Sequence, residues 1–278
     1  MPHCVFAISG TRMDTVVPGA LGSFLYVMGA TLQLGGILRE QPASRRLILG
    51  LTSLAALAHL IAVAGLMFTP EGLHLGLFRV AALVSLAMVL LILALAFTRP
   101  LENLFVVLLP LAALTLIGAL VLDSPFAPLP DPEYGLVIHV ILAILAYAVL
   151  AVAVAQALVT GWQESQLRKR RSFTVLTNLP PLQTMERLLF EMLWVGLALL
   201  TLAIASGVYF LDDMFEQRVV HHTVLSISSW VIFAILLWGR HRLGWRGRTA
   251  IRWTLTGFLM LVLAYFGSKL VIEIILGG

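Results

Sequence analysis

The feature that most constrains this chain is a series of eight long apolar segments with few charged residues. A helix needs about 20 mostly apolar residues to cross about 30 Å of hydrocarbon, and each segment is long enough. None shows the alternating pattern of a membrane strand. The sequence therefore predicts an all-α, polytopic membrane helix bundle with about eight transmembrane helices, at residues 16–38, 47–68, 73–97, 101–122, 135–161, 187–211, 223–239 and 250–276.

The composition excludes several classes of protein. Of the 278 residues, 60% are hydrophobic and only 12% are charged, against about 25% charged in a soluble domain. Soluble enzymes, nucleic-acid-binding modules and disordered chains are therefore excluded. The single cysteine, Cys4, excludes an intramolecular disulfide and a cysteine-based zinc site. No nucleotide, zinc-hydrolase or serine-hydrolase motif is present, so we expect a protein that is not an enzyme.

Lysine and arginine gather in every second connection, which predicts the orientation of the helices. The basic connections are those around residues 39–46, at 99, at 168–171 and at 240–252, whereas the alternate connections carry mainly aspartate and glutamate. Basic connections remain in the cytoplasm. We therefore expect both chain termini to lie outside the cytoplasm.

The chain shows no internal repeat and no linker that would mark a domain boundary. We expect one membrane domain over residues 1–278, with residues 1–15 as an N-terminal tail. Met13 is an alternative to Met1 as the true start of the protein.

Ionisable groups inside a membrane segment are costly, so each needs an explanation. His59 lies near the middle of segment 47–68. It is either an axial haem ligand or proton-relay group, or a neutral histidine hydrogen-bonded to a neighbouring helix. Lys269 lies in the outer half of the last segment. It reaches outward to the interface, neutralises Glu273 one turn later, or meets an anionic group such as a haem propionate.

Three further histidines share the outer side of the predicted membrane. His139 lies about one turn inside the outer end of segment 135–161, and His221 and His222 come directly before segment 223–239. Two neutral imidazoles are a common pair of axial ligands for haem iron. Adjacent helical residues point in different directions, so His221 and His222 would not both bind one metal. Solvated loop residues are the alternative for this pair, and we expect structural roles for the remaining histidines, His3, His74 and His241.

Residues 134–276 contain several distinctive motifs. They are the histidine-led segment HVILAILAYAVLAVAVAQAL, the cytoplasmic element LPPLQTMER, the loop GWRGR and the final run AYFGS. In these motifs the chain resembles the cytochrome c assembly family of haem-handling membrane proteins, the CcsA, CcmC and CcmF group. Its length is most similar to that of the short branch found in the bacterial inner membrane.

The resemblance implies roles for two histidines. His139 matches an outward-facing histidine that the haem handlers use on iron, and His59 occupies a place comparable to their membrane-embedded histidine. The haem handlers also carry a tryptophan-rich WWD segment before the span equivalent to residues 223–239. Here that place reads LDDMFEQRVVHHTV, without tryptophan. We expect His221, which lies in this segment, to act as the partner of His139.

The leading hypothesis is therefore a haem-binding or haem-handling membrane protein. It holds haem b through His139, His221 and His59, with Lys269 available for a propionate. Its partners would be the lipid bilayer, haem and another membrane protein. The alternative is an accessory or regulatory subunit of a membrane transporter for divalent cations, without stable haem, because LPPLQTMER and GWRGR face the cytoplasm. A third hypothesis is a small-solute transporter that uses His59 and Gln156.

Overall fold

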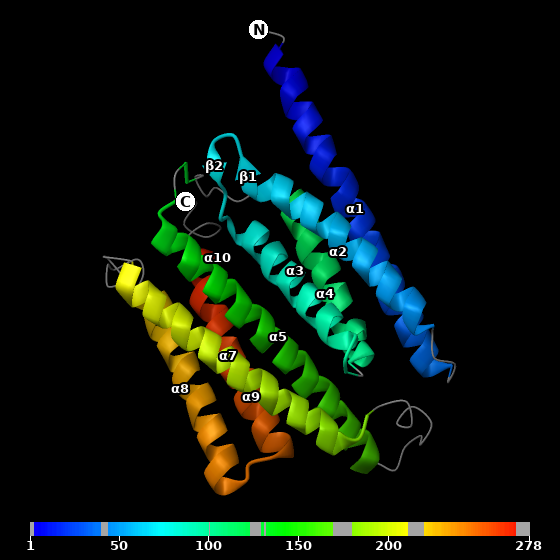
Figure 1. Cartoon of the computed structure of the whole chain (residues 1–278), viewed down its shortest axis with the longest axis vertical. Coiled ribbons are helices and arrows are strands. Elements are labelled where there is room, and N and C mark those ends of the chain that lie inside the picture. Colours follow the sequence, from blue (N-terminus) through cyan, green and yellow to red (C-terminus); the bar gives the residue numbers. More distant parts are fainter. Residues whose placement is uncertain are drawn as a thin grey trace. The chain divides into compact units, whose positions relative to one another are not determined.

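The computed structural model describes residues 3–39, 44–99, 101–122, 129–130, 132–168, 180–210 and 220–270. Among these residues, eight helical segments are long and apolar enough to cross a membrane. The predicted all-α, eight-span bundle is therefore confirmed (Figure 1). The spans are Met13–Leu38, Arg45–Met67, Leu77–Ala96, Glu102–Val121, Tyr134–Arg168, Leu182–Phe210, His222–Leu243 and Gly247–Leu270.

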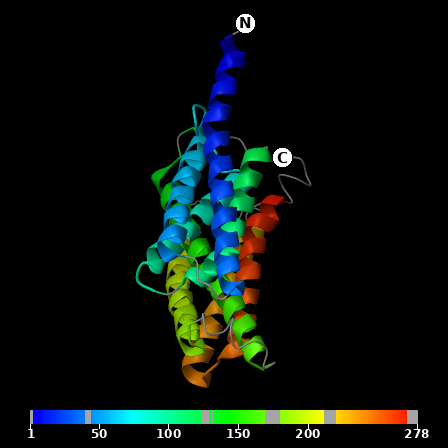
Figure 2. The same ribbon diagram turned by 90° about the vertical axis from the view of Figure 1, so that its right-hand side faces the viewer.

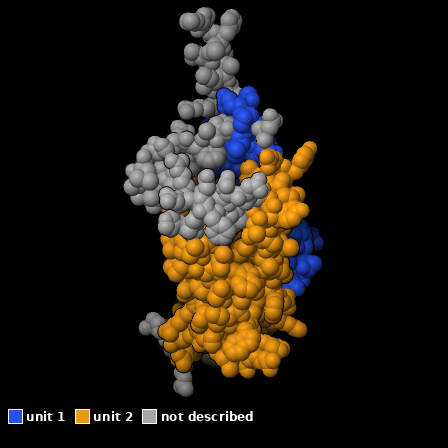
Figure 3. Space-filling model, turned by 90° about the vertical axis from the view of Figure 1, so that its left-hand side faces the viewer, with its two compact units in different colours: residues 1–132, 277–278 blue, residues 133–276 orange. Residues whose placement is uncertain are grey.

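The chain divides into two compact units, which are coloured separately in Figure 3. Unit 1 comprises residues 1–132 together with 277–278, and unit 2 comprises residues 133–276. The histidines of interest are divided between them. His59 belongs to unit 1, whereas His139, His222 and Lys269 belong to unit 2.

Unit 1 is built on four long helices. They are α1 (His3–Leu38), α2 (Arg45–Met67), α3 (Leu77–Ala96) and α4 (Phe105–Val121), the last preceded by the short 3₁₀ helix η1 (Glu102–Leu104). Helix α1 lies along α2 in both ribbon views (Figures 1 and 2) and also packs against α4. At Gly22 of α1, a Cβ atom would lie only 3.3 Å from the carbonyl oxygen of Ala55 and from the nitrogen of His59. A small residue there allows α1 to approach α2 closely.

A short β-hairpin connects α2 and α3, and the sequence did not predict it. Strand β1 (Phe68–Thr69) pairs with β2 (Gly72–Leu73) in antiparallel register. The turn requires Gly72, whose φ of 125° favours glycine and whose Cβ would lie 2.2 Å from the carbonyl oxygen of Leu129. Leu73 also forms an isolated bridge with Leu129, so the hairpin anchors the chain beyond α4.

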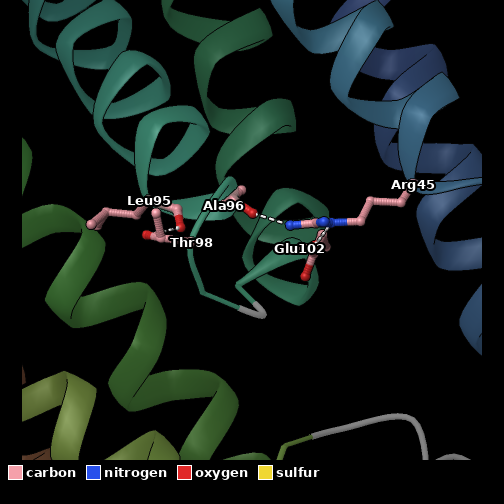
Figure 4. Close-up of polar contacts among 5 residues, drawn as sticks. All are labelled: Arg45, Leu95, Ala96, Thr98 and Glu102. Carbon is pink, nitrogen blue, oxygen red and sulfur yellow. Dashed lines mark hydrogen bonds and ion pairs between the residues drawn. The ribbon is translucent and has the colours of Figure 1, made fainter.

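Arg45 holds the opposite end of unit 1 together (Figure 4). Its Nε donates a hydrogen bond to Oε1 of Glu102 over 2.6 Å, and its terminal nitrogen donates to the carbonyl oxygen of Ala96. This carbonyl belongs to the last turn of α3, where the final carbonyls of a helix have no partner within the helix. One side chain at the start of α2 therefore connects the end of α3 to η1.

Unit 2 contains α5 (Tyr134–Arg168), α7 (Leu182–Phe210), α8 (Val220–Leu243) and α9 (Gly247–Val262). Helix α9 continues through the π-helical turn η2 (Leu263–Gly267) into α10 (Ser268–Leu270). The helix pair α5–α7 has the most extensive packing, and α9 packs against both α5 and α8. Ser229 of α8 donates a hydrogen bond to the carbonyl oxygen of Gly257 on α9 over 2.8 Å.

The motifs LPPLQTMER and GWRGR meet within unit 2. Glu186, from the first motif, accepts a hydrogen bond over 2.9 Å from the backbone nitrogen of Gly247, in the second. Gly247 has φ of 52° and begins α9, where backbone N–H groups lack partners within the helix and a carboxylate is favourable. Gln163 of α5 donates to the carbonyl oxygen of Pro180 over 3.0 Å. The two motifs thus connect α5, α7 and α9.

Replacing Arg45 tests the connection at the end of unit 1. Arg45→Gln removes the ion pair with Glu102 and the hydrogen bond to Ala96, and we expect it to lower the free energy of unfolding by about 1 kcal/mol. The loss is modest because the Arg45 side chain is 54% exposed, so solvent screens the ion pair. Thermal unfolding in detergent measures it. Arg46→Gln is the matched control, and equal stability of the two variants would contradict the role given to Arg45.

Candidate functional site

His139 lies on α5 and contacts α7 through its Nδ1 atom. This atom lies 2.9 Å from the carbonyl oxygen of Ala203 and 3.3 Å from Oγ of Ser206, both on α7. The helices can approach this closely because Gly135 faces Phe210, and a Cβ at Gly135 would lie 2.6 Å from that side chain. The small side chain of Ala203 leaves its carbonyl accessible to the imidazole.

This contact determines which nitrogen of His139 carries the proton. A carbonyl oxygen only accepts hydrogen bonds, so Nδ1 carries the hydrogen and donates it to Ala203. Nε2 then carries the lone pair. Among the residues that the structure describes, none forms a hydrogen bond with Nε2. Histidines that bind metals through one nitrogen usually donate the other N–H to a carbonyl or carboxylate, and His139 has this arrangement.

The second imidazole of the site belongs to His222. It extends from the start of α8 and is close enough to His139 for the two imidazoles to repel each other when both are protonated. Its ring packs edge-on against Tyr265, with the ring centroids 6.2 Å apart. The sequence prediction named His221 instead, and the side chain of His221 lies outside the described residues. His139 and His222 are therefore the two imidazoles that the structure brings together.

Aromatic rings and a cation complete the site. Tyr265 contacts the rings of Tyr147, at 6.4 Å, and Phe266, at 5.2 Å. Nζ of Lys269 lies 5.5 Å from the centroid of the Tyr265 ring, within the range of a cation–π interaction. Lys269 thus lies against Tyr265, the ring that also packs against His222, while Glu273, its other expected partner, lies outside the described residues. The sequence did not single out His222 or the three aromatic residues, although the AYFGS motif contains Tyr265 and Phe266.

His59 has a separate environment in unit 1. Its side chain is completely buried, and Nδ1 lies 3.2 Å from the hydroxyl of Tyr26 on α1, which is also completely buried. Nε2 faces the backbone of Ala82 on α3 without a hydrogen bond of normal geometry. This arrangement is typical of a neutral histidine hydrogen-bonded to a neighbouring helix.

Within the described part of the chain, no group of three or more histidine, cysteine, aspartate or glutamate side chains could hold a metal ion.

The fold and the site define a multi-span helical membrane protein with paired imidazoles at one end of unit 2. The chain belongs to the cytochrome c assembly protein family, whose model matches residues 49–276. The predicted family is therefore confirmed. The matched region covers His59, His139, His222 and Lys269, and also the π-helical turn.

Individual relatives support the family and the location. The chain is 30% identical to the inner membrane protein YpjD of Escherichia coli K12 over 256 residues, which are 90% of this chain and 95% of the relative. It is 33% identical to an uncharacterised 28.8 kDa protein of Azospirillum brasilense over 73% of this chain and 78% of the relative. Protein HemX of Brevibacillus brevis is 25% identical over 48% of this chain and 49% of its own length. No solved structure matches this chain. The predicted multi-pass location in the bacterial inner membrane is confirmed.

A double-mutant cycle tests the structural pairing of Tyr26 with His59. Tyr26→Phe leaves Nδ1 of a fully buried histidine without its partner, so we expect a loss of about 1–3 kcal/mol in the free energy of unfolding. With His59→Leu, the two effects should be non-additive by about 0.5–3 kcal/mol. Denaturation in mixed micelles measures this. Tyr209→Phe, at a tyrosine that is 80% exposed, is the control, and additive effects would contradict the pairing.

Proposed function

We propose that this protein binds haem at the histidine end of unit 2, with Nε2 of His139 as one axial ligand of the iron. The supporting observation is the hydrogen bond from Nδ1 of His139 to the carbonyl oxygen of Ala203. This bond fixes the tautomer and the direction of the ring, and directs the lone pair of Nε2 away from α7. Bound haem would supply a reducible iron centre. The chain supplies its ligands and its orientation.

His222 is the second axial ligand in this proposal. Its imidazole already interacts with that of His139, and the two come from different helices, α5 and α8, as ligands on opposite faces of a porphyrin must. His221 is the neighbouring alternative that the sequence suggested. Because consecutive helical residues point in different directions, only one of the two can complete the pair with His139.

Other side chains at the site could contact the porphyrin ring and the propionates of haem. The rings of Tyr265 and Phe266 offer aromatic surface to a flat macrocycle, and Lys269 offers positive charge to a propionate. The chain has one cysteine, so it lacks the two thiols that attach haem covalently in a C-x-x-C-H motif. The proposed cofactor is therefore haem b, held by ligation and exchanged through its ligands. In this role the protein is a haem carrier or regulator and does not catalyse a reaction.

His59 is the candidate for a second haem position, in unit 1, which the family resemblance suggests. Its burial and its hydrogen bond to Tyr26 support a structural role instead. The haem spectrum of His59→Ala distinguishes a haem ligand from a structural residue. The accessory-subunit alternative rested on two motifs that face the cytoplasm. Their hydrogen bond to each other, between Glu186 and Gly247, gives both a role within unit 2 that does not require a partner.

Reconstitution of the purified protein with haem tests the proposal. We expect a six-coordinate, low-spin b-type spectrum in the wild type. His139→Ala and His222→Ala should each abolish the six-coordinate form and weaken haem binding at least about tenfold, because each removes one ligand. His221→Ala is the matched control and should retain the spectrum, and so should His59→Ala.

Three other outcomes of the reconstitution would change the proposed haem site. If the wild type shows no haem spectrum, the proposal fails and the accessory-subunit alternative is favoured. If His221→Ala alone abolishes the six-coordinate form, His221 and not His222 is the second ligand. Loss only in His59→Ala would place the haem in unit 1.

We also propose that the histidine site faces the outside of the cell, as the distribution of lysine and arginine indicates. With Cys4 replaced by serine, single cysteines at Ser124 and Ser172 report on alternate connections. An impermeant maleimide should label Ser124→Cys in intact cells and label Ser172→Cys only after the membrane is opened. Labelling of Ser172→Cys in intact cells would reverse the orientation.

A further inference from the structure

The last span of unit 2 contains a π-helical turn, and a side chain from another helix is hydrogen-bonded beside it. The turn, η2, covers Leu263–Gly267, between α9 and α10. π-helical turns are rare, often lie at functional sites, and arise where a group is inserted between hydrogen-bonding partners of the helix. Here the hydroxyl of Tyr147, on α5, donates a hydrogen bond to the backbone directly before the turn.

The hydroxyl of Tyr147 occupies the place of a normal helical hydrogen bond. It donates a hydrogen bond to the carbonyl oxygen of Leu261, and the backbone N–H of Tyr265 faces the same hydroxyl oxygen. Leu261 and Tyr265 are four residues apart, so in a continuous α-helix they would bond to each other. Ser268 stabilises the altered turn, because its Oγ donates to the carbonyl oxygens of Ala264, over 2.6 Å, and Tyr265, over 3.0 Å.

The π-helical turn determines which way the following residues face. It holds one residue more than an α-helical turn, and each residue of an α-helix advances by about 100° around the axis. Everything beyond the turn is therefore rotated by about that angle relative to an uninterrupted α-helix. In the observed arrangement Tyr265 packs against His222, and Nζ of Lys269 lies over the Tyr265 ring.

We propose that Tyr147 is a positioning residue of the histidine site: its hydroxyl maintains the π-helical turn, and the turn holds Tyr265 and Lys269 at His222. Tyr147 is itself almost completely buried, and its ring also packs against Phe266 with the centroids 6.0 Å apart. The identity of the ligand as haem rests on the proposed function. The placement of Tyr265 and Lys269 by Tyr147 does not depend on it.

Tyr147→Phe is the central test, since it removes the hydroxyl and retains the ring. Without the hydroxyl, Leu261 and Tyr265 can bond to each other, the turn becomes α-helical, and Lys269 rotates away from Tyr265. Tyr134→Phe, at a tyrosine that is 91% exposed on the same helix, is the matched control. Ser268→Ala is a second, milder variant that weakens the same turn and retains the packing of Tyr147.

The first readout needs no haem. The chain has two lysines, Lys169 and Lys269, so an amine-acylating reagent followed by mass spectrometry gives the rate at Lys269 with Lys169 as an internal reference. In the haem-free protein, we expect Tyr147→Phe to raise the rate at Lys269 several-fold and Ser268→Ala to raise it less. The rate at Lys169 should be unchanged in both variants and in Tyr134→Phe.

The second readout uses the haem-loaded protein. We expect Tyr147→Phe to weaken haem binding several-fold and to shift the low-spin electron paramagnetic resonance signal, because the His222 ring loses its packing against Tyr265. A fall in thermal stability with an unchanged Lys269 rate, haem affinity and signal would make Tyr147 merely structural and overturn the proposal. If Tyr147→Phe fails to fold, the Lys269 rate, the haem affinity and the signal of Ser268→Ala test the proposal in its place. A wild type that binds no haem while Tyr147→Phe still changes the Lys269 rate would overturn the proposed function and leave the positioning role standing.

Discussion

The hydrogen bond between Nδ1 of His139 and the carbonyl oxygen of Ala203 is the interaction on which the proposed site depends. It connects α5 to α7, the helix pair with the most extensive packing in unit 2, and it does so through an imidazole that retains a second, uncommitted nitrogen. The same contact therefore serves structure and chemistry: it connects two helices and leaves the lone pair on Nε2, the nitrogen that does not face Ala203. The close approach at Gly135 makes it possible.

A second hydrogen bond, from the buried hydroxyl of Tyr147 to the carbonyl oxygen of Leu261, positions other residues of the site. It keeps a π-helical turn in the last span and thereby determines where Tyr265 and Lys269 lie. In both hydrogen bonds a side chain donates to a backbone carbonyl oxygen of another helix. Within a membrane there is no water to accept these hydrogen bonds, so a backbone carbonyl is the most available acceptor. Glu186 also satisfies a backbone group at a helix end, because its carboxylate accepts a hydrogen bond from the backbone nitrogen of Gly247 at the start of α9.

The sequence predicted the spans well, because the length of an apolar segment is set by the thickness of the bilayer and can be read locally. It also singled out His139, since a histidine inside a span is costly and conspicuous, and the structure shows that this residue connects α5 to α7. It did not identify His222 as the imidazole beside His139, or Tyr147 as the cause of a π-helical turn. Both depend on which way a side chain faces around its helix axis, and a single inserted residue changes that direction by about 100°. Hydropathy carries no such information when nearly every face of a helix is apolar, and Tyr147 in LAYAVLAV looks like any other core residue.

In the proposed site, the imidazoles of His139 and His222 hold one haem iron between them. Near-infrared magnetic circular dichroism of the ferric, haem-loaded protein tests it most directly, because the energy of the charge-transfer band identifies the pair of axial ligands. We expect the band of two neutral imidazoles in the wild type, and its loss in both His139→Ala and His222→Ala. A band typical of any other ligand pair, or an unchanged band in His139→Ala, would contradict it.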